Sequence, residues 1–206
     1  DQHHETLAQQ EAAAERADAQ APPAAAPEKA PLSGVIAVCA GEGMAEIYAD
    51  LGATVISGGQ TMNPSAEDLL LAVEQNPAQE LVLLPNNSNI ILTADQVKSL
   101  AKKKVAVVKS KYITQGLAAM LKFNPEQGAE ENSREMSTAL DSVINGELTY
   151  AVRDTKYNGF QIKANDLLAL MQGEISGCGQ DMEAVLLKLV EDMVAAHGEA
   201  EIISML

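Results

Sequence analysis

The chain has 206 residues, of which 47% are apolar, enough to bury a core without disulfide or metal support. Its formal net charge of −15 repels nucleic-acid phosphates and anionic membrane surfaces. With 3% aromatic residues and no tryptophan, it also lacks the rings on which single-stranded nucleic acids stack. These properties argue against a nucleic-acid-binding protein and favour a partner with a basic surface.

Two cysteines, Cys39 and Cys178, are too few for a disulfide framework and favour a reducing compartment, so we expect a cytoplasmic protein. No apolar run approaches the ~18 residues that a membrane-spanning helix needs, and no signal peptide is recognisable. The chain begins at Asp1 and ends in the apolar run 202–206. We therefore expect both ends to be cut from a longer polypeptide.

Residues 1–31 are predicted to be a flexible linker rich in alanine and proline. Their first part has good helix formers, but Leu7 is nearly its only large apolar residue, so such a helix has no face to bury. Prolines then break the helix and leave an extended segment. His3 and His4 have no third metal ligand nearby, and we interpret them as solvated.

From Gly34 onward, short apolar runs alternate with helical patterns. The runs are continuous, as expected of strands that are buried on both faces. Strands alternating with helices predict a parallel sheet with helices on both faces, over residues 32–123. The predicted strands are 35–40, 54–57, 81–84 and 105–109, and the predicted helices are 44–51, 66–74, 94–103 and 113–121.

Three capping signals place the helix ends in this portion. Gly52 follows the first helix as a left-handed stop. Asn63 and Pro64 are predicted to be the N-cap and first residue of the second helix. The spacing from Thr93 to Gln96 is that of a capping box, which predicts that the third helix begins there.

Residues 124–206 are predicted to form a helix and a second, smaller α/β portion that is truncated at its C-terminus. We expect two strands to pair across the polar turn 154–159, and a short helix to start at Asn165 and Asp166. The full set is a helix at 129–144, strands at 148–153 and 160–163, a helix at 167–172, a loop or weak strand at 173–179, a helix at 181–197 and a strand at 202–206.

Polar loops follow the first three predicted strands, and the carboxyl ends of parallel strands meet at one edge of a sheet. Because three such loops converge there, the sequence predicts a ligand or partner site at this edge, to which Lys109 and Lys111 add positive charge. The candidate residues in these loops are Gly41, Glu42, Gly43, Gly58, Gly59, Gln60, Thr61, Asn63, Ser65, Asn86 and Asn87.

Each loop also has a purely structural interpretation. The single Gly-x-Gly motif can be a tight turn, and Glu42 puts a negative charge where a phosphate would lie. The small polar residues of the loop 58–65 can cap their own helix, and Asn86 and Asn87 can form only a local turn. Arg153, at the end of a predicted strand, is either structural or a further contributor to the site.

The sequence contains no convincing catalytic constellation. It has no metal-spaced Cys/His set, and His197, the one histidine outside the amino-terminal tail, ends a predicted helix. General acid–base chemistry would have to rely on Glu42, Asp154 and a few amides. We therefore expect no enzymatic activity, no catalytic residue, no metal and no cofactor in this chain.

Taken together, the segments 40–43, 58–65, 84–87, 89–92 and 151–155 resemble the C-terminal domain of the bacterial dihydroxyacetone-kinase-like proteins. Members of this family have been described as DAK phosphatases, and they include the catalytic subunit of fatty acid kinase. The resemblance runs from about Gly34 to the end, and the eight-residue string 58–65 is its most specific part.

The resemblance implies a DegV-like α/β fold and a role in phospholipid metabolism. It implies a domain that docks a DegV-type fatty-acid-binding protein, which presents the acyl carboxylate for phosphorylation. Mg-ATP is then expected only in an amino-terminal kinase domain, which is absent here and would be a partner in cis. In the lipid carriers a polar loop cradles the carboxylate, and the loop 58–65 is its nearest equivalent in this chain.

Two functions remain open, together with a plainer third. The first is a partner-docking module, which predicts a broad contact footprint. The alternative is a domain that binds a small ligand, either a fatty acid or a phosphorylated metabolite, with or without weak phosphatase activity. It predicts a closed apolar pocket that ends at the amides of residues 60–63. The third is a scaffold domain that forms a homodimer.

Overall fold

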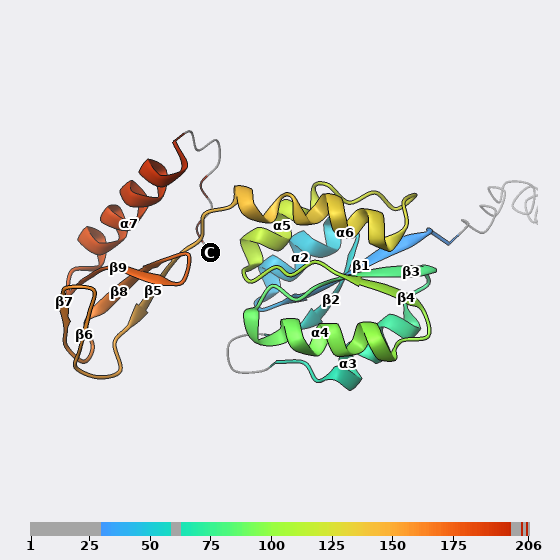
Figure 1. Ribbon diagram of the computed structural model, residues 1–206, viewed down its shortest axis with the longest axis horizontal. Coiled ribbons are helices and arrows are strands. Elements are labelled where there is room, and N and C mark those ends of the chain that lie inside the picture. Colours follow the sequence, from blue (N-terminus) through green and yellow to red (C-terminus); the bar gives the residue numbers. More distant parts are fainter. Residues whose placement is uncertain (1–29, 59–62, 199–202, 204, 206) are drawn as a thin grey trace, which may run out of the picture. The chain divides into compact units, whose positions relative to one another are not determined.

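A computed structural model describes residues 30–58, 63–198, 203 and 205 (Figure 1). The predicted linker 1–31 lies almost entirely outside the described residues, as do three of the five positions of the predicted strand 202–206, and both stay predictions. The chain divides into two units, Asp1–Ala30 and Pro31–Leu206. The described elements all belong to the second unit.

The first part of this unit is a four-stranded parallel sheet. Its strands are β1 (Ser33–Cys39), β2 (Ala53–Ser57), β3 (Glu80–Leu84) and β4 (Lys104–Val107), in the order β2-β1-β3-β4. Every neighbouring pair is parallel. The central strands β1 and β3 are almost wholly buried, in agreement with their continuous apolar runs. The predicted parallel α/β fold is confirmed.

Helices cover both faces of this sheet (Figure 1). Alternate residues of a strand point to opposite faces, so β1 contributes Val35 and Ala37 to one core and Ile36 and Val38 to the other. The first face is covered by α2 (Glu42–Asp50), α5 (Ile113–Met120) and α6 (Ala129–Ser137), and the second by α3 (Ala66–Gln75) and α4 (Ser88–Leu100).

The structure corrects two predicted helix starts. Ser65, not Asn63, is the N-cap of α3, because Ser65 and Asp68 form a reciprocal capping box. Asn87 is the N-cap of α4, so this helix begins six residues before the start predicted from Thr93. Gly52 has a φ of 88° and its amide bonds the carbonyl of Ala49, which confirms the predicted stop after α2.

The helix predicted at 129–144 is shorter in the structure. After α6, the amides of Thr138 and Ala139 bond carbonyls three residues back, which ends the α-helix, and a 3-10 turn follows at Leu140–Ser142 (η1). Although the sequence placed this helix in the second portion, Ala129 and Met136 pack in the core of the parallel sheet.

The second part is a small antiparallel sheet with one long helix (Figure 1). Strands β5 (Gly146–Tyr150), β8 (Leu167–Met171) and β9 (Glu174–Gly179) pair in the order β5-β8-β9, and α7 (Met182–His197) packs on them. A hairpin joins β6 (Thr155–Tyr157) to β7 (Phe160–Ile162). No helix in the described part of the chain is long and apolar enough to cross a bilayer.

Two predictions in this part were wrong. The segment predicted as a short helix at 167–172 is the central strand β8, because its apolar residues pair with strands on both sides. The strand predicted at 148–153 does not pair across the next turn, since β5 pairs with β8 instead. Strand β6 lies inside the predicted turn 154–159 and pairs with β7 across a two-residue turn at Asn158 and Gly159.

Candidate functional site

The site predicted from sequence lies where the strand order of the parallel sheet reverses. The chain passes from β1 to β2 on one side and then to β3 and β4 on the other. The loops that follow β1 and β3 therefore lead to helices on opposite faces, α2 and α4. Open α/β sheets bind ligands and partners in the crevice at such a switch point.

Asn86, predicted as a contact residue, is buried at the base of this edge with a φ of 54°. Its side-chain amide donates to the carbonyl of Val38 and to the hydroxyl of Tyr48, both at 3.0 Å. Its backbone amide donates to Oγ of Ser110 at 3.0 Å, and that hydroxyl donates back to Oδ1 of Asn86 at 2.8 Å. Both side-chain polar atoms of Asn86 are thus used inside the protein.

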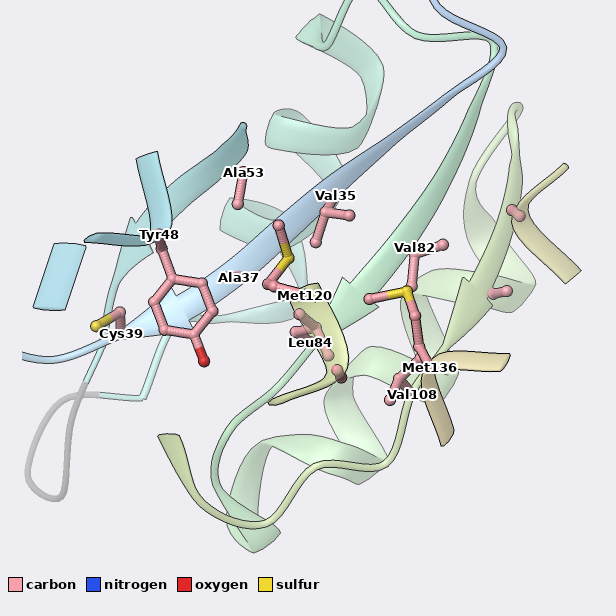
Figure 2. Packing of buried hydrophobic residues seen from close by; sticks show 13 residues of the cluster. Val35, Ala37, Cys39, Tyr48, Ala53, Val82, Leu84, Val108, Met120 and Met136 are labelled. Atoms are coloured by element: carbon pink, nitrogen blue, oxygen red, sulfur yellow. The ribbon is translucent and has the colours of Figure 1, made fainter. Parts of the chain in front are cut away.

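Tyr48 of α2 extends this network to the first residue of α5. Its hydroxyl donates to the carbonyl of Ile113 at 2.7 Å, and the whole residue is buried. Burial raises the pKa of Tyr48 well above its ordinary value, and the hydrogen bond from Asn86 opposes that shift only in part. Figure 2 shows the Tyr48 ring beside Cys39 in the core under α2.

Gly116 in α5 leaves the room that this network occupies. A methyl group there would overlap Oδ1 of Asn86 and the hydroxyl of Tyr48. The buried network is called the Asn86 network below, and its members are Tyr48, Asn86, Ser110 and Gly116. Sequence reasoning missed all of these except Asn86. The detectable signal was Gly116, a glycine inside an apolar helical pattern, which points to a close approach.

Above the network, the loop after β1 is open to solvent. Gly41, Glu42 and Gly43 are exposed. Gly41 is the N-cap of α2 with a φ of 85°, and no side chain among the described residues caps this helix end. These three exposed residues form an accessible part of the predicted site.

The loop after β2 is described only at its two ends. Gly58 is buried and its amide donates to the carbonyl of Cys39, which ties this loop to the end of β1. Asn63 and Ser65 are exposed, and Ser65 caps α3. Its hydrogen bonds to Asp68 lower the pKa of that carboxyl. The predicted site residues Gly59, Gln60 and Thr61 lie outside the described residues.

The remaining loop residues at this edge are largely engaged within the protein. Asn87 is half-buried, and its side chain accepts a bond from the amide of Asn89 as the cap of α4. Lys109, expected to add positive charge, pairs with Asp95 at 3.1 Å. The accessible described part of the predicted site, called the rim below, is Gly41, Glu42, Gly43, Asn63 and Ser65.

Arg153 lies elsewhere, in an exposed bend after β5 in the antiparallel part. Among the described residues it forms no ion pair or hydrogen bond that joins it to the rim. The neighbouring Asp154 accepts a bond from the amide of Ala164 at 2.8 Å, which holds the turn.

Two cavities lie away from the rim. One of about 280 Å³ lies between β9 and α7 and is lined by residues that include Gly177 and Val185. The other, of about 450 Å³, is an open groove on α4 between Leu92 and Leu100. Neither is lined by a described rim residue. No group of three or more His, Cys, Asp or Glu side chains that could hold a metal occurs within the described ranges.

The chain is similar in sequence to longer bacterial proteins. The chain is 38% identical over 199 residues to Protein YloV of Bacillus subtilis, covering 96% of the chain and 35% of YloV. It is 37% identical over 166 residues to an uncharacterized protein of Staphylococcus aureus strain USA300, covering 80% of the chain and 30% of that protein. The chain thus spans about a third of the length of these relatives.

A DegV family protein, Cg2579 of Corynebacterium glutamicum, has a similar fold, with a TM-score of 0.53 and 18% sequence identity. The match covers 78% of the chain and 72% of Cg2579, so the expected DegV-like fold is confirmed. The model of the FakA-like C-terminal family, which takes its name from fatty acid kinase, matches residues 34–206. The chain therefore belongs to the FakA-like C-terminal family.

Proposed function

We propose that this chain is the partner-docking module of a larger fatty-acid-kinase-like protein, and that it binds a DegV-type fatty-acid-binding protein through the rim. The observation that carries the proposal is the family match over residues 34–206. The relatives are about three times longer than this chain, which leaves ample length for separate catalytic domains.

The construction of the rim supports docking. Glycine backbone and small polar side chains allow another protein to approach closely over a broad area. The Asn86 network beneath the rim joins β1, α2 and the loops after β3 and β4 through buried hydrogen bonds. A rigid base reduces the entropy lost on association, because the contact residues are already ordered.

In this proposal the chain itself is not an enzyme. Mg-ATP and the phosphoryl-transfer residues belong to the kinase domain of the parent protein, which is the partner in cis. The buried Cys39 and the half-buried Cys178 are free thiols, which supports a reducing compartment such as the cytoplasm.

Calorimetric titration of the chain with a purified DegV-family carrier, and separately with free oleate, tests the proposal. We expect saturable binding of the carrier that weakens as salt rises, because the chain carries a net charge of −15. Binding of oleate alone would replace docking with the small-ligand alternative. Binding of neither would reject both and leave the scaffold interpretation, which predicts a dimer in sedimentation.

A further inference from the structure

Helix α2 has two parallel rows of exposed residues that do not pack in the hydrophobic core. Residues four apart lie above one another on a helix. One row is Gly43, Ile47 and the C-cap residue Leu51, where Ile47 and Leu51 are 44% and 38% exposed. The adjacent row is acidic and exposed, and consists of Glu42, Glu46 and Asp50.

The helix dipole favours Glu42 in the first turn, but the rest of the acidic row is unfavourable for the isolated helix. Carboxylates four residues apart repel each other, and Asp50 lies in the last turn, where the helix dipole disfavours negative charge. No basic residue occupies that turn. Among the described residues, none of the three acids forms an ion pair or a side-chain hydrogen bond.

Some acidic residues on other helices are paired with a lysine, whereas Glu131 and Glu135 of α6 form no ion pair among the described residues. Glu130 of α6 pairs with Lys98 at 3.2 Å, Asp95 of α4 pairs with Lys109, and Asp192 of α7 pairs with Lys188. The unpaired row on α2 lies directly beside exposed apolar side chains. A surface that departs from local stability rules in this way is expected where another molecule supplies the missing contacts.

We propose that these two rows, together called the α2 face, are a docking surface for a basic protein partner. Ile47 and Leu51 contact an apolar centre on the partner, and lysine or arginine side chains around that centre pair with the acidic row. The inference rests on the proposed function and deepens it, because the partner is the fatty-acid carrier and the α2 face continues the rim from Gly43.

Gly43 belongs to both surfaces and marks their junction. A Cβ atom built there meets nothing within 4 Å, so the helix does not need glycine for its own packing. Its bare backbone lets the partner approach the apolar row closely. The unpaired charge distinguishes this face from the groove on α4, where Asp95 beside Leu92 and Leu100 is already paired.

Calorimetry of the chain with the oleate-loaded DegV-family carrier tests the α2 face through two pairs of variants. Ile47→Ser is matched by Leu71→Ser, because Leu71 is 56% exposed on α3 of the opposite sheet face. Glu46→Lys is matched by Glu67→Lys, a change in the first turn of α3. Thermal unfolding of each variant verifies that it is folded.

We expect each α2 variant to weaken the carrier's affinity by about tenfold or more, and each α3 variant by less than about twofold. Glu46→Lys should also flatten the dependence of affinity on salt. Equal losses in the two helices, or unchanged affinity in the α2 variants, would overturn the α2 face but leave the proposed function standing. No binding by the unchanged chain would overturn both.

Discussion

The side-chain amide of Asn86 donates a hydrogen bond to the hydroxyl of Tyr48 at 3.0 Å, across 38 positions of sequence. The bond joins the loop after β3 to α2, two segments that leave the sheet toward opposite faces. Because both partners are buried, the bond is shielded from water, and losing either partner leaves unpaired polar atoms inside the protein.

Tyr48→Phe should lower the free energy of unfolding by about 1–3 kcal/mol, because the carbonyl of Ile113 and one hydrogen of the Asn86 amide lose their partner. Urea denaturation measures the change. Tyr150→Phe is the control, since Tyr150 is 59% exposed and its replacement should alter stability by less than about 0.5 kcal/mol. Equal effects of the two substitutions would contradict the importance of the network.

Gly116→Ala should destabilise the domain by about 1–3 kcal/mol or more, because the new methyl group overlaps the buried Asn86 and Tyr48 side chains. Gly43→Ala is the matched change in α2, where the methyl group meets open space. Alanine is the better helix former, so this variant should be more stable by about 0.5–1 kcal/mol. Thermal melts of the two variants should move in opposite directions.

Burial of Tyr48 also predicts a pH dependence. Because its pKa is raised in the folded state, the folded protein keeps the phenolic proton at a pH where the unfolded chain loses it. The resulting stabilisation is complete below the ordinary pKa of 10.0 and is lost as the pH rises through the folded-state pKa.

Urea denaturation from about pH 8 to about pH 11 measures this dependence. Stability above about pH 10 should fall more steeply in the unchanged protein than in Tyr48→Phe, which has no phenol to ionise. Identical slopes would show that Tyr48 does not titrate differently in the two states.

Ser65→Ala should remove the N-cap of α3 and cost about 1 kcal/mol. Ser65→Thr keeps the hydroxyl and should retain most of that stability. Ser88→Ala, at the first residue of α4, controls for the loss of a hydroxyl that does not cap the helix. If Ser65→Ala weakens carrier binding while Ser65→Thr does not, the cap matters for the shape of the rim as well as for stability.

The parallel half of the fold was predictable because its signals are local. Runs of apolar residues such as 35–39 and 81–84 are typical of strands buried on both faces when helical patterns separate them. The helix predicted at 181–197 likewise agrees with α7 to within one residue. The family resemblance of the loops depended on consecutive residues, and it too was readable without a structure.

The wrong predictions fell on segments whose local sequence fits more than one structure. Contacts with residues far along the chain decide between those structures. Residues 167–171 suit either a helix or a strand, and pairing with both β5 and β9 makes them a strand. The spacing from Thr93 to Gln96 fits a capping box, but the helix starts earlier in the chain, with Asn87 as its N-cap.

By itself, the sequence determined the acidic charge, the parallel α/β order, the family and the edge of the sheet at which polar loops gather. Only the tertiary structure decided which of those polar residues are exposed and can contact another molecule. The side chain and amide of Asn86 are hydrogen-bonded to Val38, Tyr48 and Ser110, all at least 24 positions away in the sequence. In contrast, the residues from Gly41 to Gly43 are exposed to solvent. Whether a polar residue can contact a partner molecule depends on such long-range neighbours. A buried polar group must form its hydrogen bonds with residues that the fold places beside it.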